Sequence, residues 1–194
     1  MTKSIDFYFD FISPYSYLAY NKLKSLKNYG DIKINYKPIL LGGLHNLGGI
    51  TPPAFNERKL KNMKDDCNLI AKKNNIPFIW NIKFPINSLY LMRGYLIMNN
   101  EVKKKYFELF FNAYWRDNID ISNEKNISTI LENLEINKEK YFDEIKKIEI
   151  KDELKKLTSL AFEKNIFGAP TFVVNNKIFW GQDRLDYALD EYYS

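Results

Sequence analysis

Cysteine and histidine, two side chains that commonly bind metals or react covalently, are almost absent from the sequence. Cysteine occurs once, as Cys67, so an intramolecular disulfide and a multi-cysteine metal site are both excluded. Histidine also occurs once, as His45, so a two-histidine zinc site is excluded and a serine–histidine–aspartate triad could use only His45. We therefore expect no metal site.

Long hydrophobic runs are missing as well. No apolar stretch approaches the ~18 residues that a membrane-spanning helix needs, so we expect no membrane partner. Residues 1–6 lack the apolar core of a signal peptide, and the single cysteine suits a reducing compartment. The cytoplasm is therefore the expected location.

A strong excess of one charge is also absent. The chain has 194 residues, with 29 basic and 24 acidic side chains and a formal net charge of +5. Its lysines form short groups dispersed among helical patterns, whereas a nucleic-acid groove requires a cluster on one surface. We expect no nucleic-acid partner. The composition and the length suit one globular domain, or one domain that carries an insertion.

Clear strand and helix patterns open the chain. Residues 5–11 alternate between apolar and polar positions, with Asp10 in the polar set, and predict a strand. Ser13 followed by Pro14 is typical of a helix start. Residues 32–39 alternate again and predict a second strand. Such a strand–helix–strand unit normally has parallel strands.

The middle of the chain lacks strand patterns. Residues 41–53 contain four glycines and two prolines and predict a turn-rich loop. Helical periodicity follows in six segments, which are residues 56–74, 87–98, 101–115, 122–134, 137–148 and 152–165. Residues 171–174 and 177–180 predict a hairpin around Asn175-Asn176, and the pattern after residue 181 predicts a final helix.

This order of elements predicts an α/β protein with a thioredoxin-like fold and an inserted all-helical domain. We expect residues 1–52 and 150–194 to form the thioredoxin-like domain and residues 53–149 to form the insertion. In such folds the start of the first helix meets the loop before the hairpin, where the X-Pro bond is commonly cis. We therefore expect a cis bond before Pro170.

The segment Ser13-Pro14-Tyr15-Ser16 has the spacing of a Cys-Pro-Tyr-Cys redox motif at this helix start. Serine cannot form a disulfide, so dithiol exchange is excluded. A helix N-terminus with a hydroxyl donor remains, and it suits a thiolate from another molecule, whose thiol pKa it would lower. The alternative is an ordinary N-cap role for Ser13, since serine caps stabilise helices by about 1 kcal/mol.

Residues 6–19 resemble the opening of the 2-hydroxychromene-2-carboxylate isomerases, which are relatives of the kappa-class glutathione transferases and of the disulfide oxidoreductase A proteins. Residues 167–172 and 179–186 resemble the end of the same family. Shorter matches between them are Leu41-Gly42-Gly43, Pro52-Pro53, residues 84–88 and Ala113-Tyr114-Trp115. The resemblance therefore runs along essentially the whole chain.

The resemblance implies glutathione as the cofactor, a small aromatic-derived substrate and a homodimer. It identifies Ser13 as the catalytic residue that holds the glutathione sulfur. The implied glutathione-binding residues are Ser13, Ala169, Pro170, Gln182 and Asp183. The expected substrate-binding residues are His45 and Asn87. The chain departs from the family pattern at three places, because His45 stands near the usual lysine, Gly49 replaces a usual asparagine and Ala169 replaces a more common valine.

We therefore expect a glutathione-dependent isomerase that acts on 2-hydroxychromene-2-carboxylate, or a similar substrate, through a reversible glutathione adduct. A kappa-like glutathione transferase or peroxidase would use the same pocket on another electrophile. A non-catalytic protein that binds thiol ligands, or a partner-binding helical insertion, would keep the scaffold without the chemistry. Cys67 lies on an apolar helical stripe, so we expect it to be a buried hydrophobic side chain.

Overall fold

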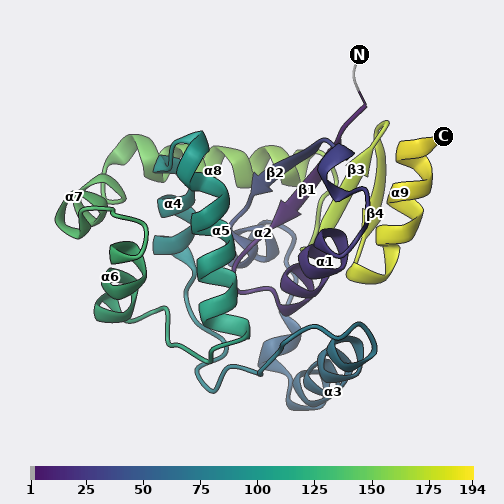
Figure 1. Ribbon diagram of the computed structural model, residues 1–194, viewed down its shortest axis with the longest axis horizontal. Helices are drawn as coiled ribbons and strands as arrows, with labels where there is room; N and C mark the ends of the chain where they lie inside the picture. Colours follow the sequence, from purple (N-terminus) through teal and green to yellow (C-terminus); the bar gives the residue numbers. More distant parts are fainter. Residues whose placement is uncertain (1–2) are drawn as a thin grey trace.

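The computed structural model describes residues 3–194 (Figure 1). The strands are β1 (Ile5–Phe9), β2 (Ile34–Pro38), β3 (Thr171–Val174) and β4 (Lys177–Trp180). The α-helices are α1 (Pro14–Lys24), α2 (Leu41–Leu47), α3 (Glu57–Lys73), α4 (Leu89–Ile97), α5 (Asn100–Trp115), α6 (Glu124–Glu132), α7 (Lys138–Glu144), α8 (Ile148–Glu163) and α9 (Leu185–Tyr193). Short 3₁₀ turns are η1 (Tyr29–Asp31), η2 (Pro53–Phe55) and η3 (Gln182–Arg184).

The strands form one mixed sheet in the order β2-β1-β3-β4. β1 pairs with β2 in parallel, and β3 pairs antiparallel with both β1 and β4. Helices α2 to α8 all lie between β2 and β3 in the chain. The predicted α/β class, thioredoxin-like fold and inserted helices are therefore confirmed, while the domain boundaries at residues 52 and 150 stay a prediction.

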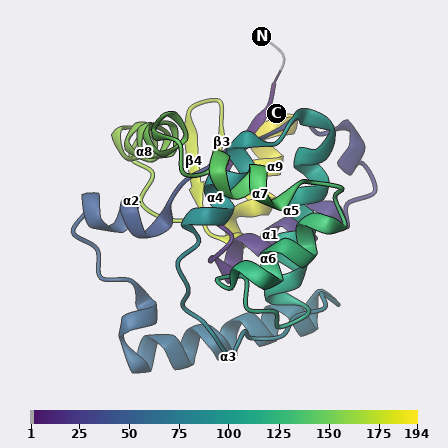
Figure 2. The ribbon, with the colours of Figure 1, turned by 90° about the vertical axis from the view of Figure 1, so that its left-hand side faces the viewer.

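Helices cover both faces of the sheet (Figure 2). On one face, Phe9 of β1 packs on Phe107 of α5, with ring centroids 4.7 Å apart. On the other face, Tyr8 of β1 packs against a smaller cluster from α2, α8 and the segments that follow β2 and α8, whose other buried members are Ile39, Leu44, Ala161 and Ile166. Because β1 is enclosed on both sides, it provides a rigid base for the turn that follows it.

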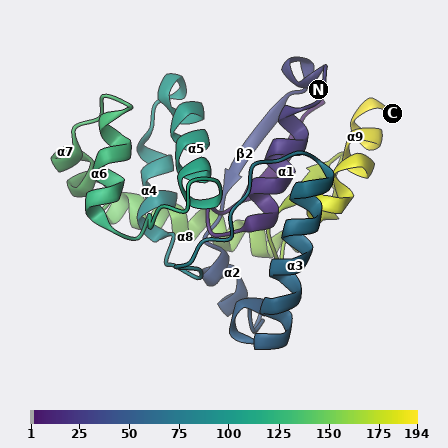
Figure 3. The ribbon, with the colours of Figure 1, turned by 60° about the horizontal axis from the view of Figure 1, so that its bottom comes forward.

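Helices α4 to α7 gather on one side of the sheet, whereas α3 lies beside α1 (Figure 3). Trp115, at the end of α5, is buried and donates its indole N–H to the carbonyl of Phe11 at 2.9 Å. This bond ties the helical insertion to the segment that leads into α1. Cys67 on α3 is fully buried, as predicted, and burial raises the pKa of its thiol. Within residues 3–194, no helix has both the length and the apolar character to cross a bilayer.

The structure corrects the prediction of a loop over residues 41–53. Helix α2 occupies Leu41–Leu47, although it contains two glycines that each weaken a helix by about 1 kcal/mol relative to alanine. Tertiary contacts outweigh this cost. Leu44 is fully buried between α2 and α8, and Thr158 of α8 accepts a hydrogen bond from the Leu40 amide at 3.0 Å. Local propensity was therefore a poor guide here, because packing against α8 decides the conformation.

The C-terminal hairpin forms as predicted. Asn175 and Asn176 have φ angles of 48° and 65°, which suit the two-residue turns that connect twisted antiparallel strands. The Ala169–Pro170 bond is cis, as predicted, and Phe84–Pro85 is a second cis bond. Both prolines precede elements that border the site described below.

Gly94 provides a test of the helical packing. A Cβ atom at this position of α4 would overlap with the hydroxyl oxygens of Tyr106 and Tyr141. The two tyrosines are buried and bonded to each other at 2.8 Å, which leaves them little room to withdraw. We expect Gly94→Ala to lower the free energy of unfolding in urea by about 1–3 kcal/mol through overpacking. Gly30→Ala is the control, because nothing lies within 4 Å of a Cβ there. Equal stabilities of the two variants would contradict this packing.

Candidate functional site

A cavity of about 650 Å³ opens where four separate segments meet. These segments are residues 12–15 at the start of α1, residues 40–55 around α2, residues 84–88 before α4 and residues 167–169 before β3. Four of the predicted site residues line this cavity, and they are Ser13, His45, Asn87 and Ala169. The fold therefore brings together residues that lie more than 150 positions apart in the chain.

Ser13 makes two hydrogen bonds at the cavity wall. Its Oγ accepts a bond from the Ser16 amide at 3.1 Å and so caps α1. The same hydroxyl donates to the Ala169 carbonyl at 2.9 Å, across 156 residues of sequence. The N-cap role that was an alternative for Ser13 is thus present, and it coexists with a contact to the residue before the cis proline. The Ser13 hydroxyl thus links the start of α1 to the loop before β3.

His45 and Asn87 reach the cavity from different elements. His45 is half-buried on α2, and burial lowers the pKa of its imidazole below the ordinary value of 6.5, so the ring is neutral at pH 7. Asn87 is exposed, and its side-chain oxygen accepts the Leu89 amide at 3.0 Å at the start of α4. The Asn87 NH₂ group has donors that can face a ligand.

Pro170, Gln182 and Asp183 do not line the cavity. Pro170 is buried behind it, and its carbonyl accepts the Gly181 amide at 2.9 Å. The backbone carbonyl and side-chain oxygen of Gln182 face the Lys22 ammonium at 3.3 and 3.5 Å. Asp183 is exposed in η3. Gln182 and Asp183 follow the end of β4 in the chain, so a ligand that touched them as well as Ser13 would extend out of the cavity.

A residue that sequence patterns do not single out holds the site together. Asp10 is fully buried, although the alternation of residues 5–11 put it in the polar set. Its carboxylate accepts the Leu41 amide at 2.8 Å and the Ile12 amide at 3.1 Å, and also bonds the Ser88 hydroxyl. Three walls of the cavity are thereby attached to one side chain. An acidic residue three positions before Ser13 was the available signal.

Burial has a marked effect on this carboxyl group. Removal from water raises the pKa of Asp10 to about 6, and the hydrogen bonds from Ser88, Leu41, Ile12 and Phe11 act in the opposite direction. At neutral pH the group is therefore ionised but poorly solvated. Leu40, the N-cap of α2, has no side-chain hydrogen bond of its own, so Asp10 supplies the acceptor at the start of that helix.

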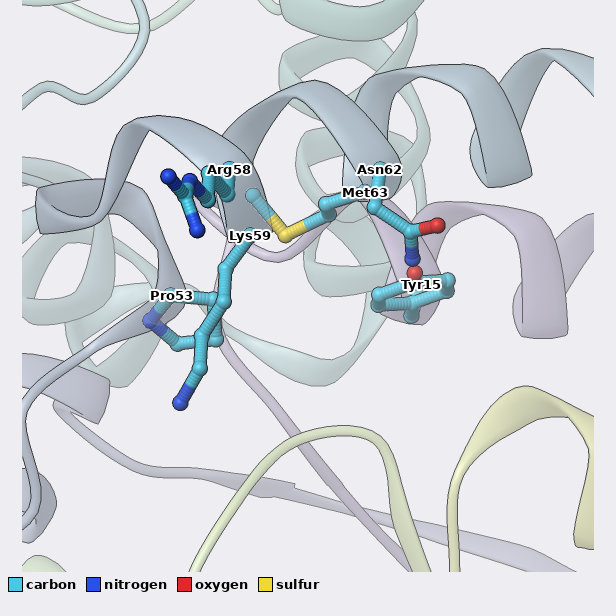
Figure 4. A pocket seen from close by; sticks show the side chains of 6 residues that line it. All are labelled: Tyr15, Pro53, Arg58, Lys59, Asn62 and Met63. Carbon is cyan, nitrogen blue, oxygen red and sulfur yellow. The ribbon is translucent and has the colours of Figure 1, made fainter.

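The charge on the cavity wall is neutral to positive. The Lys59 ammonium and the neutral His45 ring both line the cavity, and its described lining contains no carboxylate. A second cavity of about 390 Å³ adjoins it and shares Tyr15, Pro53, Lys59 and Met63 with it, with Arg58 and Asn62 added from α3 (Figure 4). In Figure 4 the Lys59 side chain extends from α3 past Pro53. This distribution favours an anionic ligand.

Two aromatic residues of the cavity were also not predicted from the sequence. Phe167 and Trp180 line the cavity, and both side chains remain exposed. Their positions beside Gly168 and Gly181 were the available signal, since a ring next to a glycine can lie close to the backbone.

A family model described as a DSBA-like thioredoxin domain matches residues 4–193. A 2-hydroxychromene-2-carboxylate isomerase of Sphingobium xenophagum is 30% identical over 189 residues, which cover 96% of each chain. The glutathione S-transferase kappa 1 of Homo sapiens is 26% identical over 202 residues, covering 96% of this chain and 89% of that relative. A solved structure of a 2-hydroxychromene-2-carboxylate isomerase matches with a TM-score of 0.86 at 28% identity, covering 96% and 92% of the two chains.

The raised pKa of Asp10 predicts a pH-dependent stability. In the unfolded chain an aspartate has a pKa of about 3.9, so the folded state binds more protons between about pH 4 and 6. Stability from this group therefore rises as the pH falls through 6. We expect the free energy of unfolding of wild type, relative to that of Asp10→Asn, to rise by about 1 kcal/mol as the pH is lowered from 6.5 to 5. Urea unfolding at the two pH values measures this difference. A parallel pH dependence of the two proteins would show that Asp10 does not titrate there.

Proposed function

The chain belongs to the DSBA-like thioredoxin family and, within it, to the family of the 2-hydroxychromene-2-carboxylate isomerases, and from this premise we propose that it is a glutathione-dependent isomerase. Its substrate would be 2-hydroxychromene-2-carboxylate or a similar aromatic-derived carboxylate. The observation that carries the proposal is the Ser13 hydroxyl, which lies at the wall of a ligand-sized cavity, at the start of α1 and 2.9 Å from the Ala169 carbonyl.

The residues present suit glutathione. The Ser13 hydroxyl would hold the sulfur, and the backbone of Ala169 would pair with the cysteinyl unit. The hydroxyl of Ser16 in the same turn of α1 is buried and has no hydrogen-bond partner within the described residues, so this turn keeps an unused donor. Asp183 is exposed in η3, where its carboxylate could receive the γ-glutamyl ammonium, beside Gln182.

Ser13 would stabilise the ionised form of a thiol. Its proton is now donated to the neutral carbonyl of Ala169, and a thiolate is a charged and therefore stronger acceptor. The positive end of α1 acts in the same direction, because Ser13 is the N-cap of that helix. Both effects favour the anion and lower the pKa of the thiol.

When bound, glutathione supplies a nucleophile that adds reversibly to a conjugated double bond and so allows its geometry to change. The chain itself would orient the substrate. The amide of Asn87 and the neutral imidazole of His45 offer hydrogen bonds to its oxygen atoms. Lys59 adds positive charge for its carboxylate, and the apolar parts of the lining exclude water from the reacting atoms.

The chain cannot carry out dithiol exchange with cysteines of its own. Ser16 occupies the position of the second cysteine in the redox motif. Cys67, the single thiol, is fully buried on α3, and burial raises its pKa. A thiol nucleophile must therefore come from a ligand.

We also propose that the enzyme acts in the cytoplasm as a homodimer. The single buried thiol suits a reducing compartment. Sedimentation velocity at several concentrations tests the assembly state, and a monomer at all of them would reject the dimer.

The role of Ser13 is tested by Ser13→Ala. We expect kcat/KM for isomerisation of 2-hydroxychromene-2-carboxylate to fall about 100-fold, as when one donor to a developing anion is removed. We also expect the thiol pKa of bound glutathione, followed by the ultraviolet absorbance of the thiolate, to return towards its value in buffer.

Loss of the helix cap alone must be separated from loss of the donor. Asn137 caps α7 in the same way, by accepting the Lys140 amide at 2.7 Å, so Asn137→Ala is the matched control. Both variants should lose about 1 kcal/mol of stability, and only Ser13→Ala should lose activity. Activity of Ser13→Ala within a few-fold of wild type would reject the role of Ser13. Conjugation of generic electrophiles without isomerisation would instead indicate a kappa-like transferase.

A further inference from the structure

Two large aromatic rings remain exposed at the rim of the cavity. Trp180, the last residue of β4, is 52% exposed, and Phe167 is 43% exposed. Their ring centroids lie 4.8 Å apart with an angle of 55° between the planes. Both residues line the cavity that contains Ser13 and Ala169. We call Phe167 and Trp180 the rim pair.

The backbone holds the rim pair close to the reacting position. Trp180 lies opposite Thr171 in the pairing of β3 with β4. Gly168 permits this placement, because a Cβ there would be 2.5 Å from the indole Nε1. The indole therefore lies against the segment just before Ala169, whose carbonyl bonds Ser13. A ligand held at Ser13 would have its neighbouring atoms within reach of Trp180.

The other tryptophans are placed differently. Trp115 is fully buried, and Trp80 packs on it at 5.8 Å between ring centroids. Trp180 alone among the three carries a half-exposed ring at a cavity. When a ligand covers apolar surface that folding leaves in water, the burial of that surface contributes favourably to the free energy of binding. A flat conjugated ring covers an indole face best, and offset stacking adds about 0.5–1.5 kcal/mol beyond area burial.

We propose that Trp180, supported by Phe167, is a specificity-determining residue that stacks on the aromatic ring of the substrate. This inference rests on the function proposed above, and it assigns the rim pair to the second substrate, because glutathione has no aromatic ring. Trp180 selects for planar aromatic compounds, while Ser13 acts on the thiol. The two parts of the cavity therefore recognise different molecules.

Trp180→Ala tests the proposal in steady-state kinetics at saturating glutathione. We expect KM for 2-hydroxychromene-2-carboxylate to rise about tenfold or more, whereas the Kd for glutathione, measured by calorimetry, changes less than twofold. Trp180→Phe should recover to within about threefold of wild type, because a phenyl ring can still stack. A merely structural role would weaken both ligands together and would not be rescued by phenylalanine.

Two further variants complete the series. Gly168→Ala keeps the tryptophan but displaces the indole, so it should raise KM in the same selective way. Tyr187→Ala is the matched control, because Tyr187 is 56% exposed but does not line the cavity. If Trp180→Ala behaves like Tyr187→Ala, or if the Kd for glutathione rises in proportion to KM, the proposal is overturned.

A binding measurement separates this inference from the proposed function. Titration of the chromene carboxylate should quench the tryptophan fluorescence of wild type, and Trp180→Phe should remove most of this quenching. Trp80 and Trp115 remain in both proteins, so the difference between the two titrations reports Trp180. Quenching without isomerase activity would retain the ring-binding role and reject the isomerase. Isomerase activity with equal quenching in both proteins would retain the isomerase and reject the role of Trp180.

Discussion

The buried carboxylate of Asp10 is the interaction on which the site depends. It accepts hydrogen bonds from the turn before Ser13, from the first amide of α2 and from Ser88 ahead of α4. Each of these segments forms one wall of the cavity. A buried charge that satisfies several donors fixes their relative positions, because losing any bond leaves an unpaired polar group away from water. The same burial removes the carboxylate from water and so raises the pKa of Asp10.

The site keeps the framework of a redox protein and changes its chemistry. The helix start, the cis proline and the contact between them are all present, with Ser13 bonded to Ala169. An oxygen in place of sulfur leaves the helix N-terminus able to stabilise an anion but unable to form a disulfide. A scaffold of this kind can therefore serve several reactions, and the side chains at one position select between them.

Local signals predicted most elements because these elements satisfy local rules. Ser13 and Pro14 start α1, Asn56 caps α3, and Asn175 and Asn176 turn the hairpin. The exception was α2, whose glycines indicated a loop. Its stability comes from Thr158 on α8 and from Asp10 on the β1 turn, which lie 118 and 31 residues away from their partners in the chain. No local pattern contains such contacts.

The amino-acid sequence by itself determined that dithiol chemistry is excluded, that Ser13 starts a helix and that the fold is thioredoxin-like, because these follow from residue types and short spacings. Only the tertiary structure decided that Asp10 is buried and that Phe167 and Trp180 share a cavity with Ser13. It also separated Gln182 and Asp183 from that cavity. The physical reason is that burial and proximity arise from packing between distant segments, which alternation and periodicity do not encode.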